Sequence, residues 1–167
     1  GDKTTRCASN HKLLTRFTNR KDTSICCVYM MKKGDNYRIG WCQLFNKGGE
    51  LHLAQRARIE RADSAWILSV HTSRTDASIN ESWVATRFGL PLLPFHAVHG
   101  AQHFTQEALN GFFGMLDVGM MRERALDCLA HFARLHNHPF YTRGERLGRQ
   151  TIFVTQACNL IPEIMML

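Results

Sequence analysis

The chain has 167 residues, 44% hydrophobic and 21% charged, proportions that fit one ordinary globular domain. No apolar run approaches the roughly 18 residues that a membrane span needs, and the first residues have no signal-peptide character. We therefore expect an intracellular, cytoplasmic protein that is not secreted and has no membrane partner. The net charge of +7 is concentrated in residues 1–61, where 13 Lys and Arg stand against 5 Asp and Glu. Such a cluster favours a phosphate backbone as partner; an ordinary solvated basic surface is the alternative.

The first predicted unit is a β-hairpin. Two apolar runs, residues 25–31 and 37–42, flank the segment Lys32 to Asn36, whose Gly-Asp-Asn sequence is typical of a tight turn. A further strand-like piece precedes this hairpin, around residues 11–14. The alternation of apolar runs and turn residues indicates that this part of the chain is built around a sheet.

Helices and one more strand are expected after the hairpin. A basic helix over residues 51–62, an apolar strand over residues 65–70 and a helix over residues 75–88 follow in that order. The order predicts an α+β fold with a small three-stranded sheet, antiparallel or mixed, flanked by helices. Two further helices, over residues 105–116 and 121–135, are expected to form a C-terminal helical extension that helps to grip DNA or simply supports the sheet.

Glu81 occupies a position where an amphipathic helix usually carries a hydrophobic residue. The apolar stripe of the helix runs through Ala77, position 81, Val84 and Phe88, at spacings of four, three and four residues. A carboxylate buried at such a position costs free energy unless it meets a cation, a hydrogen-bond donor or a metal. Glu81 is therefore a candidate metal ligand or half of an ion pair, with a partly exposed glutamate at the edge of the stripe as the alternative.

Taken in order, these features resemble the GIY-YIG nuclease domain. Cys27-Val28-Tyr29, a short turn, Arg38-Ile39-Gly40, an arginine-bearing helix, a third strand and a helix with Glu81 follow one another over residues 24–95. The resemblance implies a DNA endonuclease that hydrolyses phosphodiester bonds with Mg²⁺ or Mn²⁺. The residue types suit that chemistry, because carboxylate oxygens are the hard ligands that Mg²⁺ prefers and arginine is a planar, permanently charged partner for phosphate.

The resemblance also implies roles for individual residues. Tyr29 would activate water, Arg56 or Arg58 would steady the phosphoryl group, and Glu81 would bind the metal. For Tyr29 the alternative is a core position in a central strand. For the two arginines the alternative is a solvated helix face, on which Arg56 pairs with Glu60 one turn later.

Two positions depart from the family pattern. Arg38 stands where the second motif has a tyrosine, and its neighbour Tyr37 faces the opposite side of the strand and cannot simply replace it. Arg38 and Tyr37 are both catalytic candidates, and Arg38 could also contact a phosphate directly. Family members often carry a histidine one helical turn after the arginine, where Arg56 is followed by Glu60. His96 is either a loop residue satisfied by its surroundings or a group that reaches back toward the site.

Several basic residues are candidates for holding double-stranded DNA, the expected partner. They are Lys32, Lys33, Arg38 and Arg61. Their charges would position the phosphate backbone, while the bases themselves are not read by such contacts.

The flanks of the predicted nuclease resemble parts of intein splicing domains of the Hint type. Residues 5–15 are similar to the histidine block of such domains, and residues 157–162 to a segment that leads back into the splicing fold. This interpretation makes the chain a homing endonuclease within a host intein, the rest of which is a further partner. The predicted division is an intein-like flank over 1–23, a nuclease core over 24–99, the helical extension over 100–136 and a second flank over 137–167. A non-catalytic DNA-binding module and an inactive intein fragment stay open as alternatives.

Overall fold

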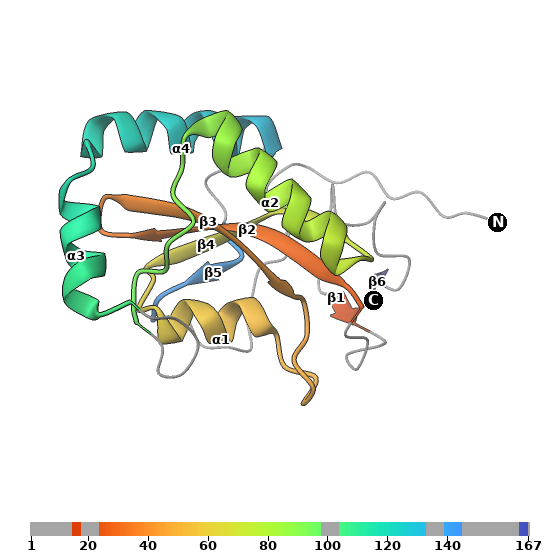
Figure 1. The fold of residues 1–167 in the computed structure, drawn as a ribbon. Coiled ribbons are helices and arrows are strands. Elements are labelled where there is room, and N and C mark those ends of the chain that lie inside the picture. The colour runs from red at the N-terminus through yellow and green to blue at the C-terminus, as the bar shows by residue number, and fades with distance from the viewer. Residues whose placement is uncertain (1–14, 18–23, 98–103, 133–138, 145–163, 167) are drawn as a thin grey trace.

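A computed structural model describes residues 15–17, 24–97, 104–132, 139–144 and 164–166 of the chain. Its elements form an α+β fold, as predicted, with helices on both sides of a sheet (Figure 1). In chain order they are β1 (Thr15–Phe17), β2 (Cys26–Lys33), β3 (Asn36–Gln43), α1 (His52–Ile59), β4 (Ser64–His71), α2 (Arg74–Phe88), α3 (Gln106–Gly114), α4 (Val118–Phe132), β5 (Tyr141–Thr142) and β6 (Ile164–Met166). The strand-like piece expected around residues 11–14 lies outside the described residues.

An antiparallel sheet of four strands, in the order β3-β2-β4-β5, forms the centre of the fold. The prediction of three strands was incomplete because β5 contributes only two residues, too few for a periodic pattern to be visible in the sequence. β2 occupies an inner position and is buried from Cys26 to Met31. Strands β1 and β6 pair separately, antiparallel to each other.

The predicted hairpin between β2 and β3 is confirmed, and its turn contains Gly34. This glycine has a φ of 57°, a left-handed conformation that a residue without a Cβ adopts at little cost. The register pairs Lys33 with Asn36 next to the turn and Tyr29 with Gly40 further along. Tyr29 and Gly40 therefore lie directly opposite each other on one face of the sheet.

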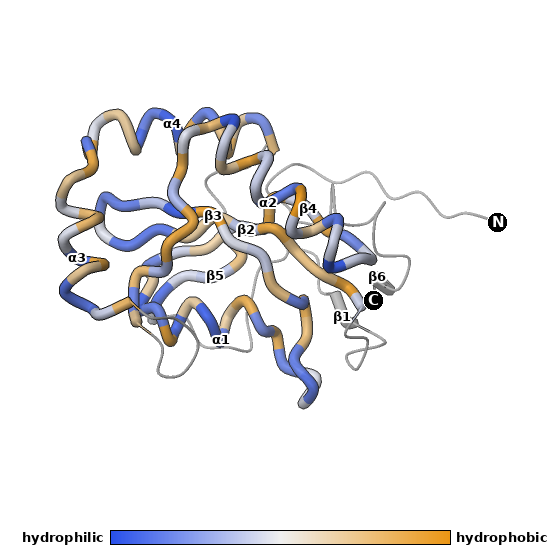
Figure 2. Tube along the Cα trace, in the orientation of Figure 1, coloured by the Kyte–Doolittle hydropathy of each residue, from blue (hydrophilic) through white to orange (hydrophobic). Residues whose placement is uncertain are grey.

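Each face of the sheet has its own helical layer. α1 packs on the face that carries Cys27, Tyr29 and Met31, whereas α2 and α4 pack on the face of Val28 and Met30. Since side chains alternate along a strand, the continuous apolar run of β2 supplies both cores. Figure 2 shows hydrophobic residues through the central strands, while the hairpin turn and the loop before α1 are hydrophilic.

Helix α2 has clear signals at both ends. The Ser73 side chain accepts a hydrogen bond from the backbone of the first turn, and Gly89 ends the helix with a φ of 61°. Ala77 and Val84 are fully buried against the sheet, and Glu81 lies half-buried on the same side of the helix. The apolar stripe predicted for this helix is therefore confirmed, with a carboxylate in its middle.

Helices α3 and α4 confirm the two predicted helices of the C-terminal extension. Leu109 and Phe113 of α3 are buried, and α4 contributes Met121, Ala125 and other residues to the core beside α2. The helical extension thus packs against the sheet as part of the same fold. Among the helices that the structure describes, none is both long and apolar enough to cross a membrane.

Candidate functional site

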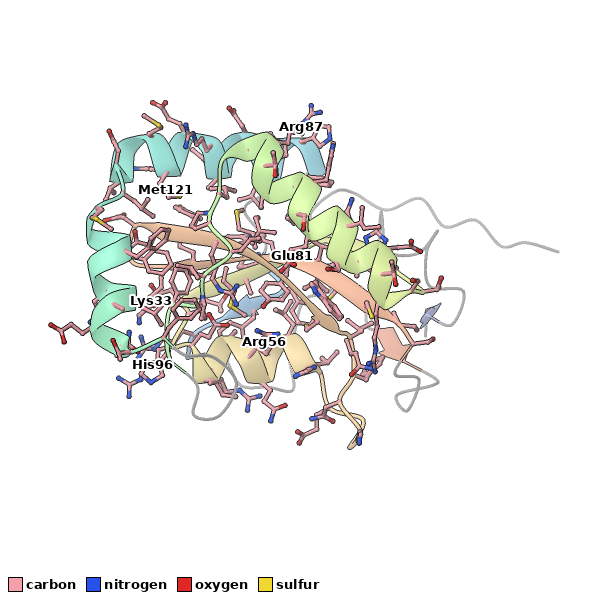
Figure 3. All side chains as sticks on the ribbon, in the orientation of Figure 1. Lys33, Arg56, Glu81, Arg87, His96 and Met121 are labelled. Carbon is pink, nitrogen blue, oxygen red and sulfur yellow. The ribbon has the colours of Figure 1, made fainter. Side chains whose placement is uncertain are left out.

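An open pocket of about 350 Å³ lies at the edge of the sheet formed by β3. It is lined by Tyr29 from β2, Arg56 from α1 and Glu81 from α2, so the three principal residues of the predicted site share one pocket. Figure 3 shows Arg56 on α1 and Glu81 on α2, on opposite sides of the sheet. The remaining lining residues are Arg38, Gly40, Trp41, Cys42, Gln43, His52, Arg74, Leu92 and Pro94.

The backbone of Trp41 in β3 connects the two helices. Arg56 Nη1 donates a hydrogen bond to the Trp41 carbonyl at 3.3 Å, and a backbone hydrogen bond from Trp41 reaches the Glu81 carboxylate. Both backbone groups are available because β3 is the edge strand of the sheet. An arginine from one helical layer and a glutamate from the other therefore meet at a single residue.

Glu81 lies half-buried beside the charges of Arg38 and Arg56. Burial raises the pKa of its carboxyl group, an effect that Arg38, the Trp41 backbone and Arg56 offset only in part. Among the described residues there is no group of three or more His, Cys, Asp or Glu that could hold a metal ion. Mg²⁺ is commonly held by only one or two carboxylates together with waters and substrate phosphates. The donor set fits a metal of that kind, with Glu81 as the protein ligand.

Tyr29 lies beneath the pocket with a side chain that is 0% exposed. Its hydroxyl oxygen accepts a hydrogen bond from Arg38 Nη2 at 3.0 Å, and the guanidinium carbons of Arg38 and Arg56 lie 5.5 and 5.9 Å from its ring centre. Burial raises the pKa of Tyr29 to about 12 in spite of these two cations. The phenol is therefore protonated at neutral pH, which suits a hydrogen-bond donor better than a base.

Gly40 makes room for that phenol. A Cβ atom added at Gly40 would lie 2.5 Å from Cζ of Tyr29, closer than real contacts allow. The two residues are partners across the strands, so the ring of Tyr29 covers the position where a side chain would stand. The glycine of the Arg38-Ile39-Gly40 motif is thus required by packing and not by its backbone angles.

Arg38 and Glu60, the two departures from the family pattern, bind each other. Arg38 Nε donates to Glu60 Oε2 at 2.8 Å, and Nη2 donates to Glu60 Oε1. The other guanidinium hydrogens of Arg38 go to Tyr29 Oη, to the Ile39 carbonyl at 2.9 Å and to the Leu92 carbonyl at 3.2 Å. The five N–H groups of this guanidinium therefore all have acceptors within the fold.

This arrangement gives Arg38 a positioning role. Arg38 and Glu60 are each only 2% exposed, and Glu60 also accepts a hydrogen bond from the Phe95 backbone at 3.0 Å. A phosphate could bind Arg38 only by displacing one of these partners. The direct catalytic and DNA contacts predicted for Arg38 thus have no free donor in this structure, and its side chain instead holds Tyr29 and the segment of residues 91–95 in place.

Three further candidates lie outside the pocket lining. Tyr37 is buried in the core beneath α2 and α4, because strand alternation turns it away from Tyr29. Arg58 is exposed on α1, so of the two candidate arginines Arg56 is the one in the pocket. His96 follows the segment 91–95, is partly exposed and does not line the pocket (Figure 3).

The predicted DNA-binding residues Lys32, Lys33 and Arg61 gather at the hairpin end of the sheet. The two lysines are the last residues of β2, and Asp63 binds the adjoining turn through a hydrogen bond from Gly34 N at 2.7 Å. Asp63 also donates its backbone N–H to the Lys32 carbonyl at 2.7 Å, which brings the segment after α1 to the same place. The cluster is therefore separate from the pocket, at the other end of β3 (Figure 3).

His52, Glu60 and Arg74 were missed as site residues by the sequence prediction. His52 and Arg74 are the first residues of α1 and α2 and line the pocket, and Glu60 lies beneath it. A local signal existed for His52 and Glu60, since both lie one helical turn from Arg56 and share its side of the helix. Arg74 had no such signal.

No protein-family model, curated protein or solved structure matched this chain.

Proposed function

We propose that the chain is a DNA endonuclease of the GIY-YIG type that hydrolyses phosphodiester bonds with Mg²⁺ or Mn²⁺. The observation that carries this proposal is the convergence of Tyr29, Arg56 and Glu81, from a strand and two helices, on one open pocket. The order strand, strand, helix, strand, helix along the chain supports it as well.

Glu81 and Arg56 have distinct roles in this proposal. Glu81 holds the divalent cation, which when bound neutralises charge on the phosphoryl oxygens and lowers the pKa of water. Arg56, whose side chain is 36% exposed, directs its remaining donors to the phosphate. Tyr29 packs beneath the guanidinium groups of Arg38 and Arg56 and stays protonated at neutral pH.

Double-stranded DNA is the proposed substrate. Arg56 and Arg74 line the pocket, and Lys32, Lys33 and Arg61 offer a second basic cluster at the hairpin end of the sheet. A positive surface attracts DNA because binding releases the counterions condensed on its phosphates. The pocket would hold the phosphate that is cleaved, and the hairpin cluster would hold the duplex at a distance from it.

A plasmid cleavage assay tests the proposal. The wild-type protein is expected to convert supercoiled plasmid to nicked or linear DNA with Mg²⁺, and to lose this activity in excess EDTA. Glu81→Ala and Arg56→Ala should each reduce the rate on the order of 10²-fold or more, since each removes a transition-state contact. Arg58→Ala is the matched control, because Arg58 lies on the same helix as Arg56 but is exposed outside the pocket. Wild-type protein that never nicks DNA, or nicking that survives Glu81→Ala, would defeat the proposal.

A non-catalytic DNA-binding module is the second candidate. The sealed side chain of Tyr29 and the fully engaged guanidinium of Arg38 favour it, because neither group is free to contact a substrate. Retention of the protein on DNA that weakens with salt, without any metal-dependent cleavage, would select this alternative.

We also propose that the nuclease is inserted in a host intein, as a homing endonuclease. Most of the two intein-like flanks lies outside the described residues, but β1 pairs with β6 in antiparallel register. This pairing brings a segment before the core beside a segment after it, as expected for the two sides of an inserted domain. Preferential cleavage of a host gene without the insertion, compared with the same gene carrying it, is the expected result.

A further inference from the structure

His52 is a pocket residue to which the resemblance implies no role. We propose that its imidazole accepts the proton of the water that attacks the phosphodiester. This inference rests on the proposed endonuclease function and adds a catalytic residue to it.

His52 combines a place in the pocket lining with a ring nitrogen that lacks a hydrogen-bond partner among the described residues. It is the first residue of α1, one turn before Arg56, and lines the pocket together with Arg56 and Glu81. The residue is partly exposed, yet its Nδ1 atom is buried and has no hydrogen-bond partner among the residues that the structure describes. Buried polar atoms in folded proteins are nearly always paired, so an unpaired one at a pocket calls for a ligand or a chemical role.

The other groups of the pocket are poor proton acceptors. Tyr29 is sealed from solvent and its hydroxyl oxygen is bound to Arg38, and arginines do not lose their protons in proteins. Cys42 is buried against Cys27, with 3.8 Å between the two sulfur atoms. Glu81 is the cation ligand in the proposed function. His52 is therefore the acceptor that remains.

The electrostatic surroundings keep His52 in its neutral form. Burial, and secondarily the charge of Arg56, lower the pKa of its imidazole below the ordinary value. A neutral imidazole at neutral pH can take a proton directly. The charged and titratable groups that line the pocket with it are Tyr29, Arg38, Cys42, Arg56, Arg74 and Glu81.

The water oxygen forms a bond to phosphorus while one of its protons moves to the imidazole of His52. The bond between phosphorus and the leaving sugar oxygen breaks, and its electron pair stays on that oxygen. The sugar oxygen then takes a proton from solvent, and His52 later returns its proton to solvent.

Kinetic variants of His52 test this inference in the full chain. His52→Ala should lose roughly 10²-fold or more of the plasmid nicking rate, and added imidazole should restore part of it. His52→Gln keeps a polar side chain and decides the result where His52→Ala does not fold, as judged by circular dichroism. His131→Gln is the matched control, because His131 is exposed on α4 and should leave the rate unchanged. Tyr29→Phe should cost less than either His52 variant.

The pH profile separates His52 from Tyr29. With His52 as the base, the wild-type rate should increase with pH through the acidic range and reach a plateau by neutral pH. In His52→Gln the midpoint of that increase should shift, because only the ionisation of Glu81 then contributes to it. A proton accepted by Tyr29 would instead make the rate climb through the alkaline range, toward its pKa of about 12. Titration of the His52 ring by NMR without metal should show a pKa below the ordinary value.

The outcomes distinguish the two proposals. A wild-type protein that cleaves DNA while both His52 variants cleave equally well overturns the role of His52 and leaves the endonuclease proposal intact. A wild-type rate that keeps increasing through the alkaline range without a plateau also overturns the role of His52 and leaves the endonuclease proposal intact. A wild-type protein with no cleavage at all overturns the endonuclease proposal and this inference with it.

Discussion

Arg38 and Glu60 stabilise the fold only as a pair, because either one without the other would leave an unpaired charge in the interior. The two side chains are each 3% exposed and share two hydrogen bonds. Removing one partner of such a pair typically costs about 3–5 kcal/mol, whereas replacing both by apolar residues is often nearly neutral. We therefore expect Arg38→Met and Glu60→Leu each to lower the free energy of unfolding by that amount, and the double variant to lose much less than the sum. Urea denaturation measures all three.

Arg58→Met is the control for this double-mutant cycle. Its side chain is exposed on the same helix, so the free energy of unfolding should change by no more than about 0.5 kcal/mol. Strictly additive effects of the Arg38 and Glu60 variants would show that the two residues do not act as a pair.

Glu81 links the stability of the fold to pH. Because burial raises its pKa in the folded protein, the folded state binds this proton more tightly than the unfolded state. Stability from this group is then fully present below the unfolded pKa near 4.5 and is lost as pH rises through the raised folded pKa. Glu81→Gln should accordingly melt at a higher temperature than wild type at pH 7, with the difference closing in acid.

Mg²⁺ should act against that difference in melting temperature at pH 7. A ligand that binds only the folded state raises its stability, so added Mg²⁺ should raise the Tm of wild type and leave Glu81→Gln unchanged. Equal shifts in both proteins would mean that Glu81 is not the metal ligand.

The pairing of β2 with β3 places Gly40 against the ring of Tyr29, so that one added methyl group at Gly40 should disturb the site. Gly40→Ala places a Cβ 2.5 Å from Cζ of Tyr29, so the ring must move or the strands must separate. Overpacking of this kind costs about 1–3 kcal/mol, and the displaced phenol should lower the nicking rate as well. Urea denaturation and the plasmid assay check both effects.

Gly111→Ala provides the comparison for Gly40→Ala. Gly111 lies within α3 with no atom within 4 Å of an added Cβ, and it is exposed. Alanine there should stabilise the protein by up to about 1 kcal/mol, since glycine is a poor helix former. A Gly40→Ala variant as stable as wild type would contradict the close contact with Tyr29.

Local patterns in the sequence were enough to predict the hairpin, α1, β4 and α2, because alternation, periodicity and end signals such as Gly89 act within a few residues. The inward position of Glu81 followed from the same periodicity. The burial of Glu60 could not be predicted, because it depends on the Phe95 backbone, 35 residues away. The sequence suggested a solvated pair of Glu60 with Arg56. The structure contains that ion pair, at 3.9 Å, but Glu60 is buried and also binds Arg38.

At the scale of the molecule, the basic cluster at the hairpin end should contribute to DNA affinity without choosing a sequence. Replacing Lys32, Lys33 and Arg61 by alanine should weaken binding to all duplexes alike. The slope of log affinity against log salt should fall by about 1 for each phosphate that the variant no longer neutralises. Fluorescence anisotropy between about 50 and 200 mM salt measures that slope.

Arg122→Ala is the control for the salt experiment. Arg122 is exposed on α4 and lies outside both the pocket lining and the hairpin cluster. Its removal should leave the slope unchanged, and a slope that responds equally to Arg122 would indicate diffuse attraction in place of a defined surface.

The contact of Arg56 and Glu81 with the same residue of β3 makes the proposed endonuclease activity depend on the completed fold. One helical layer supplies the guanidinium of Arg56 and the other supplies the carboxylate of Glu81, and the two groups share Trp41 only when both layers have packed on the sheet. A chain that has assembled only half of its structure would thus be harmless to DNA. Loss of cleavage on heating should therefore coincide with the first loosening of either helix, ahead of the melting of the central strands.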